Sequence, residues 1–175
     1  MTNKMIKIII SWCLVIIWCL VIYNFSNMDT VESNNKSKET INQVIDTSIQ
    51  TSNKVGIITD IPTPEEKEEL IDKLNKPLRK CMHAFIYFIL SLLMLNALRI
   101  SNISKNKYLI TIMICFIYAL TDEYHLTLIL GRTGQFSDVI IDTTGSFIGI
   151  IFCKLINQKL IKRNNKKQKE TKKID

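Results

Sequence analysis

The chain has 175 residues, of which 47% are apolar, and a formal net charge of +7 at pH 7. The apolar residues gather in four long blocks, whereas soluble domains alternate apolar and polar residues so that each element keeps a solvated face. This distribution argues against a soluble enzyme, a nucleic-acid-binding domain and a disulfide-stabilised scaffold. Four of the five cysteines lie inside the apolar blocks without a C-x-x-C or zinc-type spacing, so we expect them to pack as small apolar residues.

The first apolar block, residues 5–25, carries Lys7 as its only charge. Lysines precede its core as in a signal peptide, but the block is longer than a signal-peptide core and no small-residue cleavage site follows it. A stretch of about 20 apolar residues matches a bilayer core of about 30 Å. The block is therefore predicted to be an uncleaved transmembrane helix.

Residues 26–80 are predicted to form a polar loop outside the membrane. Chain breakers in this stretch occur at residues 33–38 and 62–64. Thr63 and Pro64 are followed by four glutamates, which is typical of a helix start. A short amphipathic helix is expected to run from there to Leu74 and to end at Pro77.

Three further apolar blocks form the predicted membrane core, residues 81–157. They cover residues 81–98, 108–124 and 139–156. Because two of these blocks are short for a bilayer, we expect an all-α, compact four-helix bundle in which each helix is supported by neighbours. The tail, residues 158–175, is dominated by lysine and is expected to be disordered or to lie on the membrane surface.

The distribution of charge predicts the orientation of the four spans. Residues 1–7, 99–107 and 154–175 together carry fourteen Lys and Arg against two acids, whereas the opposite side has an excess of acids. Positively charged segments stay in the cytoplasm, so both termini are predicted to be cytoplasmic in a bacterial cell membrane. The basic tail then faces anionic lipid, where each lysine contributes about 1 kcal/mol, and no nucleic acid partner is needed to explain it.

Polar residues at the outer edges of the spans are predicted to meet at one membrane face. Charges are costly within a bilayer, so such positions are treated as a hypothesis for a functional site. The candidate binding residues are Arg79, His83 and Tyr87 on the second span, Asp122, Glu123 and His125 at the end of the third, Arg132 in the next loop, and Asp138 and Asp142 on the fourth.

The spacing of these residues favours two polar helix faces. Arg79, His83 and Tyr87 are four residues apart and so share one face of a helix. Asp138 and Asp142 share a stripe with a G-x-x-x-G pair one and two turns further on. Small residues let another helix approach closely, so the two aspartates are expected at a helix interface rather than against lipid.

Three interpretations of this polar cluster are open from the sequence. It is a structural ion network in which the two arginines neutralise the aspartates, a pocket for a lipid headgroup or other ligand, or a metal or acid–base catalytic site. No spacing such as H-E-x-x-H is present, so no metal and no cofactor is predicted. Gly134, Asp138 and Asp142 also match the second half of the CDP-alcohol phosphotransferase signature, but its first half is absent.

Several motifs in chain order resemble the VanZ-like family of small bacterial membrane proteins. These are Phe25-Ser26-Asn27, Arg79-Lys80-x-x-His83-x-Phe85-x-Tyr87, Asp122-Glu123-x-His125, Gly131-Arg132 and Asp138-x-x-x-Asp142-x-x-Gly145-x-x-x-Gly149. The resemblance covers about residues 5–157, with Leu126 standing where the family usually has a glutamine. It implies a link to reduced susceptibility to teicoplanin, a lipid-tailed glycopeptide, because the named member has that link.

The expected function is therefore to lower susceptibility to such lipoglycopeptides by binding membrane lipid or a lipid-linked wall precursor, or by altering access to it. The alternative is a membrane enzyme that modifies a lipid or wall-precursor headgroup, with a carboxyl group among like charges as general acid. A third interpretation is an accessory subunit that docks a membrane protein partner through residues 27–80. Whether the chain is an enzyme stays open from the sequence.

Overall fold

The computed structural model describes residues 3–27, 30–55, 63–103, 106–129 and 134–171, and these ranges form five α-helices and no strand. The helices are α1 (Asn3–Ser26), α2 (Thr30–Val55), α3 (Pro64–Ser101), α4 (Lys107–Leu126) and α5 (Phe136–Thr171). Within the described residues, α1, α3, α4 and α5 each contain a segment long and apolar enough to cross a membrane. The prediction of an all-α protein with four spans is confirmed.

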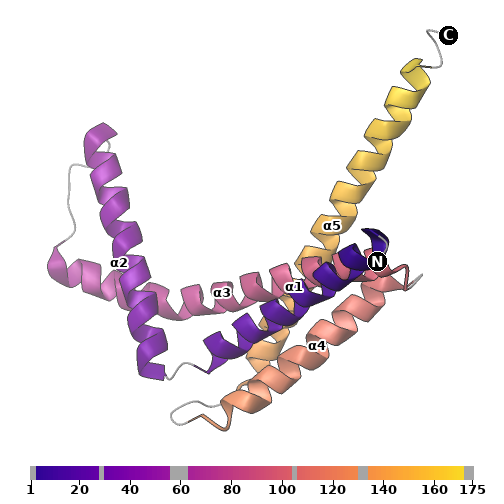
Figure 1. Cartoon of the computed structure of the whole chain (residues 1–175). Helices are drawn as coiled ribbons and strands as arrows, with labels where there is room; N and C mark the ends of the chain where they lie inside the picture. Colours follow the sequence, from indigo (N-terminus) through magenta and orange to yellow (C-terminus); the bar gives the residue numbers. More distant parts are fainter. Residues whose placement is uncertain (1–2, 28–29, 56–62, 104–105, 130–133, 172–175) are drawn as a thin grey trace.

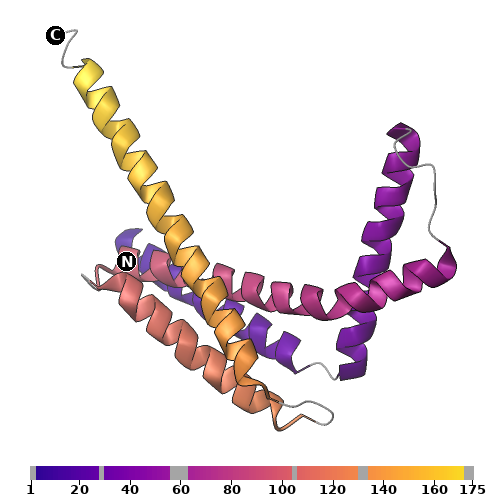
Figure 2. The same cartoon turned by 180° about the vertical axis from the view of Figure 1, so that it is seen from behind.

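The four spans form an up-and-down bundle built around α3 (Figure 1). α1 and α4 run in one direction along the bundle, whereas α3 and α5 run in the other (Figures 1 and 2). α3 packs against each of the other four helices. The start of α1 and the end of α5 consequently lie on the same side, as expected for an even number of spans. Which side of the membrane this is stays a prediction.

Polar contacts within apolar surroundings fix α1 against its neighbours. The indole Nε1 of Trp18 donates a hydrogen bond to the Ile86 carbonyl of α3 over 3.0 Å. The hydroxyl of Tyr118 on α4 donates to the Cys19 carbonyl of α1 over 2.7 Å. Hydrogen bonds to main-chain carbonyls fix the position of α1 along the bundle axis. Apolar packing alone does not fix it, because the surfaces of the helices are as apolar as lipid.

α3 and α5 approach each other closely along the small-residue stripe of α5. A Cβ atom added at Gly145 would lie 2.7 Å from the carbonyl carbon of Ala84, and one added at Gly149 would lie 2.8 Å from the Phe88 carbonyl oxygen. The buried Ser146 hydroxyl donates to the Tyr87 carbonyl over 3.2 Å. The prediction that this stripe faces another helix is confirmed, and the partner is α3.

The predicted loop between the first two spans contains α2, so this part of the prediction was wrong. The helix runs through the supposed breakers at residues 33–38. Isoleucines recur every four residues at Ile41, Ile45 and Ile49. Ion pairs join Lys38 to Asp72 over 2.7 Å and Lys67 to Asp46 over 2.6 Å, and so hold α2 against the start of α3. Ser and Asn disfavour a helix by less than about 0.7 kcal/mol each, a penalty that an apolar stripe and packing outweigh.

The predicted start of α3 is confirmed, but its predicted end is wrong. Thr63 caps the helix, because the Glu66 amide donates to its hydroxyl over 3.3 Å and its own amide donates to the Glu66 carboxylate over 2.8 Å. The helix then continues through Pro77 to Ser101. A proline inside a helix lowers the stability of that helix by about 3 kcal/mol. Packing on both sides of Pro77 offsets this loss, because α2 contacts the first part of α3 and the other spans contact the rest.

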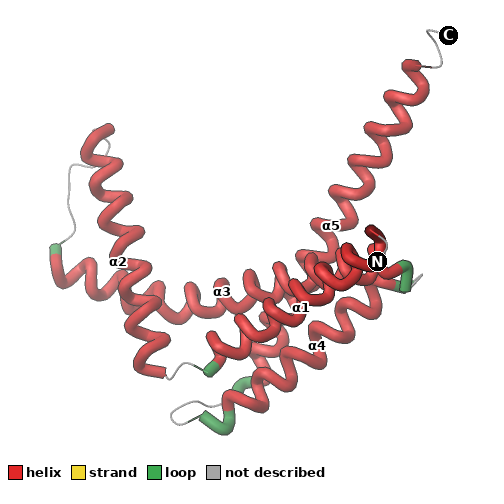
Figure 3. Tube along the Cα trace, viewed as in Figure 1, coloured by secondary structure: helices red, strands yellow, loops and turns green. Residues whose placement is uncertain are grey.

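The basic tail is helical as far as Thr171, so the expectation of disorder was wrong for this stretch. Lysine is a good helix former, and a helix that begins inside an apolar span needs no new nucleus to continue. Figure 2 shows the end of α5 extending away from the bundle, and Figure 3 shows the described loops and turns confined to the helix ends. Contact between the tail and the membrane surface stays a prediction, and residues 172–175 lie outside the described part.

Candidate functional site

The predicted polar residues that the structure describes gather at one end of the bundle. Figure 1 shows that α1 and α4 end there and α5 begins there. At this end the polar faces of α3 and α5 meet in a lysine–aspartate ion pair and a histidine–aspartate contact. Lys80 Nζ lies 3.4 Å from Asp138 Oδ1, and one helical turn further His83 Nδ1 lies 3.7 Å from Asp142 Oδ1. The close approach of the two helices at the glycine stripe brings these pairs together.

Three fully buried polar side chains at this end have atoms without a hydrogen-bond partner among the described residues. They are the hydroxyls of Ser26 and Tyr87 and Oδ1 of Asp142, in residues that are 2%, 0% and 1% exposed. A buried polar atom left unbonded costs about 1–3 kcal/mol, and more if it is charged. Such atoms are retained where a bound group completes their hydrogen bonds, so the Ser26 and Tyr87 hydroxyls, which line the cavity described next, mark a candidate binding site.

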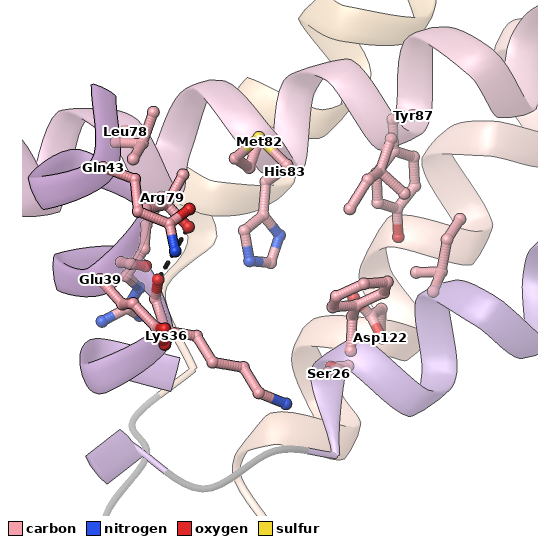
Figure 4. A pocket seen from close by; sticks show the side chains of 15 residues that line it. Ser26, Lys36, Glu39, Gln43, Leu78, Arg79, Met82, His83, Tyr87 and Asp122 are labelled. Carbon is pink, nitrogen blue, oxygen red and sulfur yellow. Dashed lines mark hydrogen bonds between the residues drawn. The ribbon is translucent and has the colours of Figure 1, made fainter. Parts of the chain in front are cut away.

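A cavity of about 480 Å³ lies beside Tyr87, between α2, α3 and the ends of α1 and α4, and is here called the α2–α3 cavity (Figure 4). Its charged and hydroxyl-bearing walls include Ser26, Lys36, Glu39, Arg79, His83, Tyr87 and Asp122. Its apolar wall comprises Ile22, Phe25, Leu78, Met82 and Ile86. Ligand pockets of about 300–1,000 Å³ with mainly apolar walls and a few convergent polar groups are typical of small-molecule sites.

The side chains of this cavity converge from four helices, α1 to α4. Figure 4 shows His83 and Tyr87 projecting from α3 into the cavity, with the Tyr87 hydroxyl directed toward Asp122 and Ser26 on the opposite side. Lys36 reaches from α2 across the cavity toward Ser26. The cavity thus has hydrogen-bond donors, a buried carboxylate and cationic groups around one space.

A second, smaller cavity of about 290 Å³ lies on the other side of His83 and is here called the α3–α5 cavity. It is lined by Arg79, Lys80, His83, Gln135, Asp138 and Ile141. Arg79 and His83 line both cavities, so they stand between the two. A change at either residue will therefore alter both spaces.

The profile of the VanZ/LLP1 family matches residues 11–157, which is most of the chain. The chain belongs to the VanZ/LLP1 family. The resemblance predicted from the motifs is thereby confirmed. No curated protein sequence and no solved structure matches the chain, so the roles of individual residues are argued from geometry alone.

Most of the site residues predicted for this VanZ/LLP1 chain do lie together. Arg79, His83, Tyr87 and Asp122 line the α2–α3 cavity, and the first three share one face of α3 as the spacing predicted. Asp138 lines the α3–α5 cavity. The buried carboxylate of Asp142 lines neither cavity and instead supports His83 from behind.

Two further predicted residues of this VanZ/LLP1 chain, Glu123 and His125, lie at the same end but outside both cavities. Glu123 accepts a hydrogen bond from the Gln135 amide and so fixes the entry to α5. The His125 ring stacks on Tyr23 at the end of α1, with ring centroids 4.8 Å apart. These contacts anchor the helix ends around the site. Arg132 lies outside the described residues, so its predicted role stays a prediction.

Several residues that line the two cavities of this VanZ/LLP1 chain were not predicted as site residues. Lys36 and Glu39 were not predicted as site residues because their segment was predicted to be a loop. They lie at helical spacing with Gln43 on α2. Ser26 stood within a family motif without an assigned role. Lys80 was named only within a family motif, and its pairing with Asp138 depends on the register between α3 and α5.

The chemistry available at this site of the VanZ/LLP1 chain is recognition and proton exchange. Among the described residues, no group of three or more His, Cys, Asp or Glu side chains is arranged to hold a metal ion. Lysine and arginine bind phosphate and carboxylate, and tyrosine, serine and aspartate bind hydroxyl groups. The apolar wall beside them suits a ligand that is part hydrocarbon.

Proposed function

We propose that this protein acts in the bacterial cell envelope by holding the headgroup of a lipid-linked surface molecule in the α2–α3 cavity, and thereby lowers susceptibility to teicoplanin-type lipoglycopeptides. The observation that carries this function is the fully buried, unbonded Tyr87 hydroxyl directed into a cavity with one polar and one apolar wall. Membership of the VanZ/LLP1 family supports the link to glycopeptides.

The two kinds of wall suit an amphipathic ligand. The apolar wall comes from α1 and α3, both of which contain membrane-spanning segments. Much of the polar wall comes from α2, which is not among the membrane-spanning helices. A cavity bounded by a span on one side and by a polar helix on the other accommodates a headgroup while its hydrocarbon chain stays in the bilayer.

For this function both termini lie in the cytoplasm, so that α2 and the cavity face the outside, where glycopeptides act. Support comes from the basic end of α5, which lies at the opposite end of the bundle from α2 (Figure 1). In a cysteine-free background, Thr47→Cys on α2 should react with a membrane-impermeant thiol reagent on intact cells. Gln158→Cys on α5 should react only after the cells are opened, and the reverse pattern would refute the orientation.

The function is tested by filling the cavity without touching its charged groups. Thr40 lines the cavity from α2, and a tryptophan at this position should block it. Thr47 is a matched control, since it is also exposed, lies two turns along the same helix and makes the same hydroxyl bond to the carbonyl four residues before it. We expect Thr40→Trp to abolish the tolerance of teicoplanin conferred by the protein and Thr47→Trp to retain it. Equal tolerance in the two variants at equal membrane levels would refute the function.

A second candidate function is a membrane enzyme acting on a lipid or wall-precursor headgroup. The observation that favours it is the pairing of His83 with the buried Asp142 carboxylate, which orients an imidazole at the cavity wall for proton transfer. Proteoliposomes that contain the protein should then convert an added headgroup lipid with turnover, and His83→Gln should stop the conversion. Stoichiometric retention of the lipid without a product favours the binding function instead.

A further inference from the structure

Tyr87 sets the first requirement for the ligand of the α2–α3 cavity. Its side chain is 0% exposed, its hydroxyl bonds to no described group, and it is directed into the cavity (Figure 4). A phenolic hydroxyl both donates and accepts hydrogen bonds. The ligand atom that meets it must therefore be polar, although it lies beside apolar residues.

Asp122 adds a second requirement, namely that the ligand group beside it donates a hydrogen bond. It is buried, lines the cavity and lies on the side toward which the Tyr87 hydroxyl is directed. An ionised carboxylate only accepts hydrogen bonds. A ligand group placed between Tyr87 and Asp122 satisfies both if it donates one hydrogen bond and accepts another, and an alcohol hydroxyl is the simplest such group.

Cationic side chains in the same cavity set a requirement for the charge of the ligand. Lys36 from α2 and Arg79 and His83 from α3 line it, and such groups recognise phosphate oxygens. Glu39 and Asp122 also line the cavity, and Asp142 lies against His83, so little positive charge is left in excess. A ligand with a single negative charge, such as a phosphodiester, therefore suits the cavity better than a multiply charged one.

We infer that the α2–α3 cavity binds a phosphodiester lipid whose headgroup carries free alcohol groups. The phosphate lies among Lys36, Arg79 and His83, an alcohol lies between Tyr87 and Asp122, and the hydrocarbon chains lie along the apolar wall. This inference rests on the proposed function, which has a surface lipid in this cavity, and adds the chemical class of that lipid. A glycerol-headed phospholipid is the simplest lipid with this chemistry.

The inference is tested with the purified full-length protein in a neutral detergent. Its affinity is measured, by the shift in unfolding temperature across a titration, for phosphatidylglycerol, phosphatidylcholine, phosphatidic acid and water-soluble glycerol phosphate. Phosphatidylglycerol alone has the single charge, the free alcohols and the chains together. We expect it to bind about ten-fold more tightly than phosphatidylcholine or phosphatidic acid, because each of these lacks the alcohol that meets Tyr87 and Asp122. Glycerol phosphate should bind still more weakly, because it lacks the chains.

A matched pair of tyrosine variants tests whether the lipid binds in the α2–α3 cavity. Tyr87→Phe removes only the buried, unbonded hydroxyl, so the free protein should remain folded, and its affinity for phosphatidylglycerol should fall about ten-fold. Tyr124→Phe removes a hydroxyl from a side chain that is 69% exposed, and its affinity should equal that of the wild type. Equal affinity for phosphatidylglycerol and phosphatidylcholine overturns the inference, as does wild-type affinity in Tyr87→Phe.

Measurements of drug susceptibility in cells distinguish failure of the inference from failure of the proposed function. If phosphatidylglycerol binds selectively through Tyr87 but Tyr87→Phe leaves teicoplanin tolerance unchanged, the inference stands and the proposed function fails. If tolerance depends on the cavity but the lipids bind without selectivity, the proposed function stands and the inference fails. If glycerol phosphate binds as tightly as the lipid, the source of the phosphate is a soluble ester and the lipid assignment is overturned.

Discussion

Gly145→Ala places a methyl group where α5 lies against the main chain of α3. The added Cβ would lie 2.7 Å from the Ala84 carbonyl carbon and 2.8 Å from its Cα atom. Both atoms belong to a helix backbone, so they cannot rotate away as a side chain would. Ordinary contact between carbon atoms begins at about 3.5 Å, so α3 and α5 must separate locally by roughly 1 Å.

The expected magnitude combines two opposing effects. Inserting a methyl group into a well-packed interface costs about 1–3 kcal/mol. Alanine is favoured over glycine inside a helix by about 1 kcal/mol, which offsets part of that cost. The difference is about 0–2 kcal/mol, and because the added methyl group meets main-chain atoms that cannot rotate away, we expect the free energy of unfolding to fall by about 2 kcal/mol. The separation should also weaken the contact between His83 and Asp142, which already lie 3.7 Å apart.

The assay is reversible unfolding in mixed micelles as the fraction of denaturing detergent rises, followed by circular dichroism. Thr144→Ala is the matched control, because it also introduces alanine in α5 but at the neighbouring exposed position. Thr144→Ala should be as stable as the wild type or slightly more stable, since threonine is the weaker helix former. If Gly145→Ala proves as stable as Thr144→Ala, the close packing of α3 against α5 is refuted.

Three further predictions concern α2 and the first half of α3. Thr63→Ala removes the cap of α3 and should destabilise its first turn by about 1 kcal/mol, seen as faster hydrogen exchange there and unchanged exchange in the spans. Pro77→Ala should raise the unfolding temperature, because it restores a helix hydrogen bond at an exposed position, and a lower temperature would mean that the proline shapes the packing. The hydrogen bond and charge of Asp72 raise the pKa of Lys38, so their contribution to stability is complete below the ordinary lysine value and is lost as the pH rises through the raised value. The distribution of spin-label distances between α2 and α3 should therefore broaden only as the pH rises above the ordinary lysine pKa, and Lys38→Met should remove this pH dependence.

The parts of the fold that the sequence predicted are those set by the bilayer. Four apolar blocks of roughly the right length correspond to α1, α3, α4 and α5, because hydrocarbon thickness fixes how many apolar residues a span needs. The face shared by Arg79, His83 and Tyr87 was also predictable, because helical periodicity alone determines it. The position of the glycine stripe of α5 at a helix interface was also predictable, because small residues let another helix approach closely.

The parts that the sequence did not predict depend on contacts between helices. α2 forms although its first turns are rich in Ser and Asn, because Ile41 is buried and two ion pairs join the helix to α3. α3 continues through Pro77 for the same reason, since packing on both sides offsets one lost hydrogen bond. The pairing of Lys80 with Asp138 requires the register of α3 against α5, which no local pattern contains. Lys36 and Glu39 of the α2–α3 cavity were missed as a direct consequence of missing α2.

The most direct test of the account compares drug susceptibility in a susceptible Gram-positive host that expresses the wild type, Asp142→Asn or Glu65→Gln at equal membrane levels. Asp142→Asn removes the buried charge that supports His83, whereas Glu65→Gln removes one charge from the exposed start of α3. We expect the wild type and Glu65→Gln to raise tolerance of teicoplanin, Asp142→Asn to lose that tolerance, and tolerance of vancomycin to stay unchanged throughout. If all three proteins give the same susceptibility to teicoplanin, the polar cluster does not carry the function and the account is contradicted.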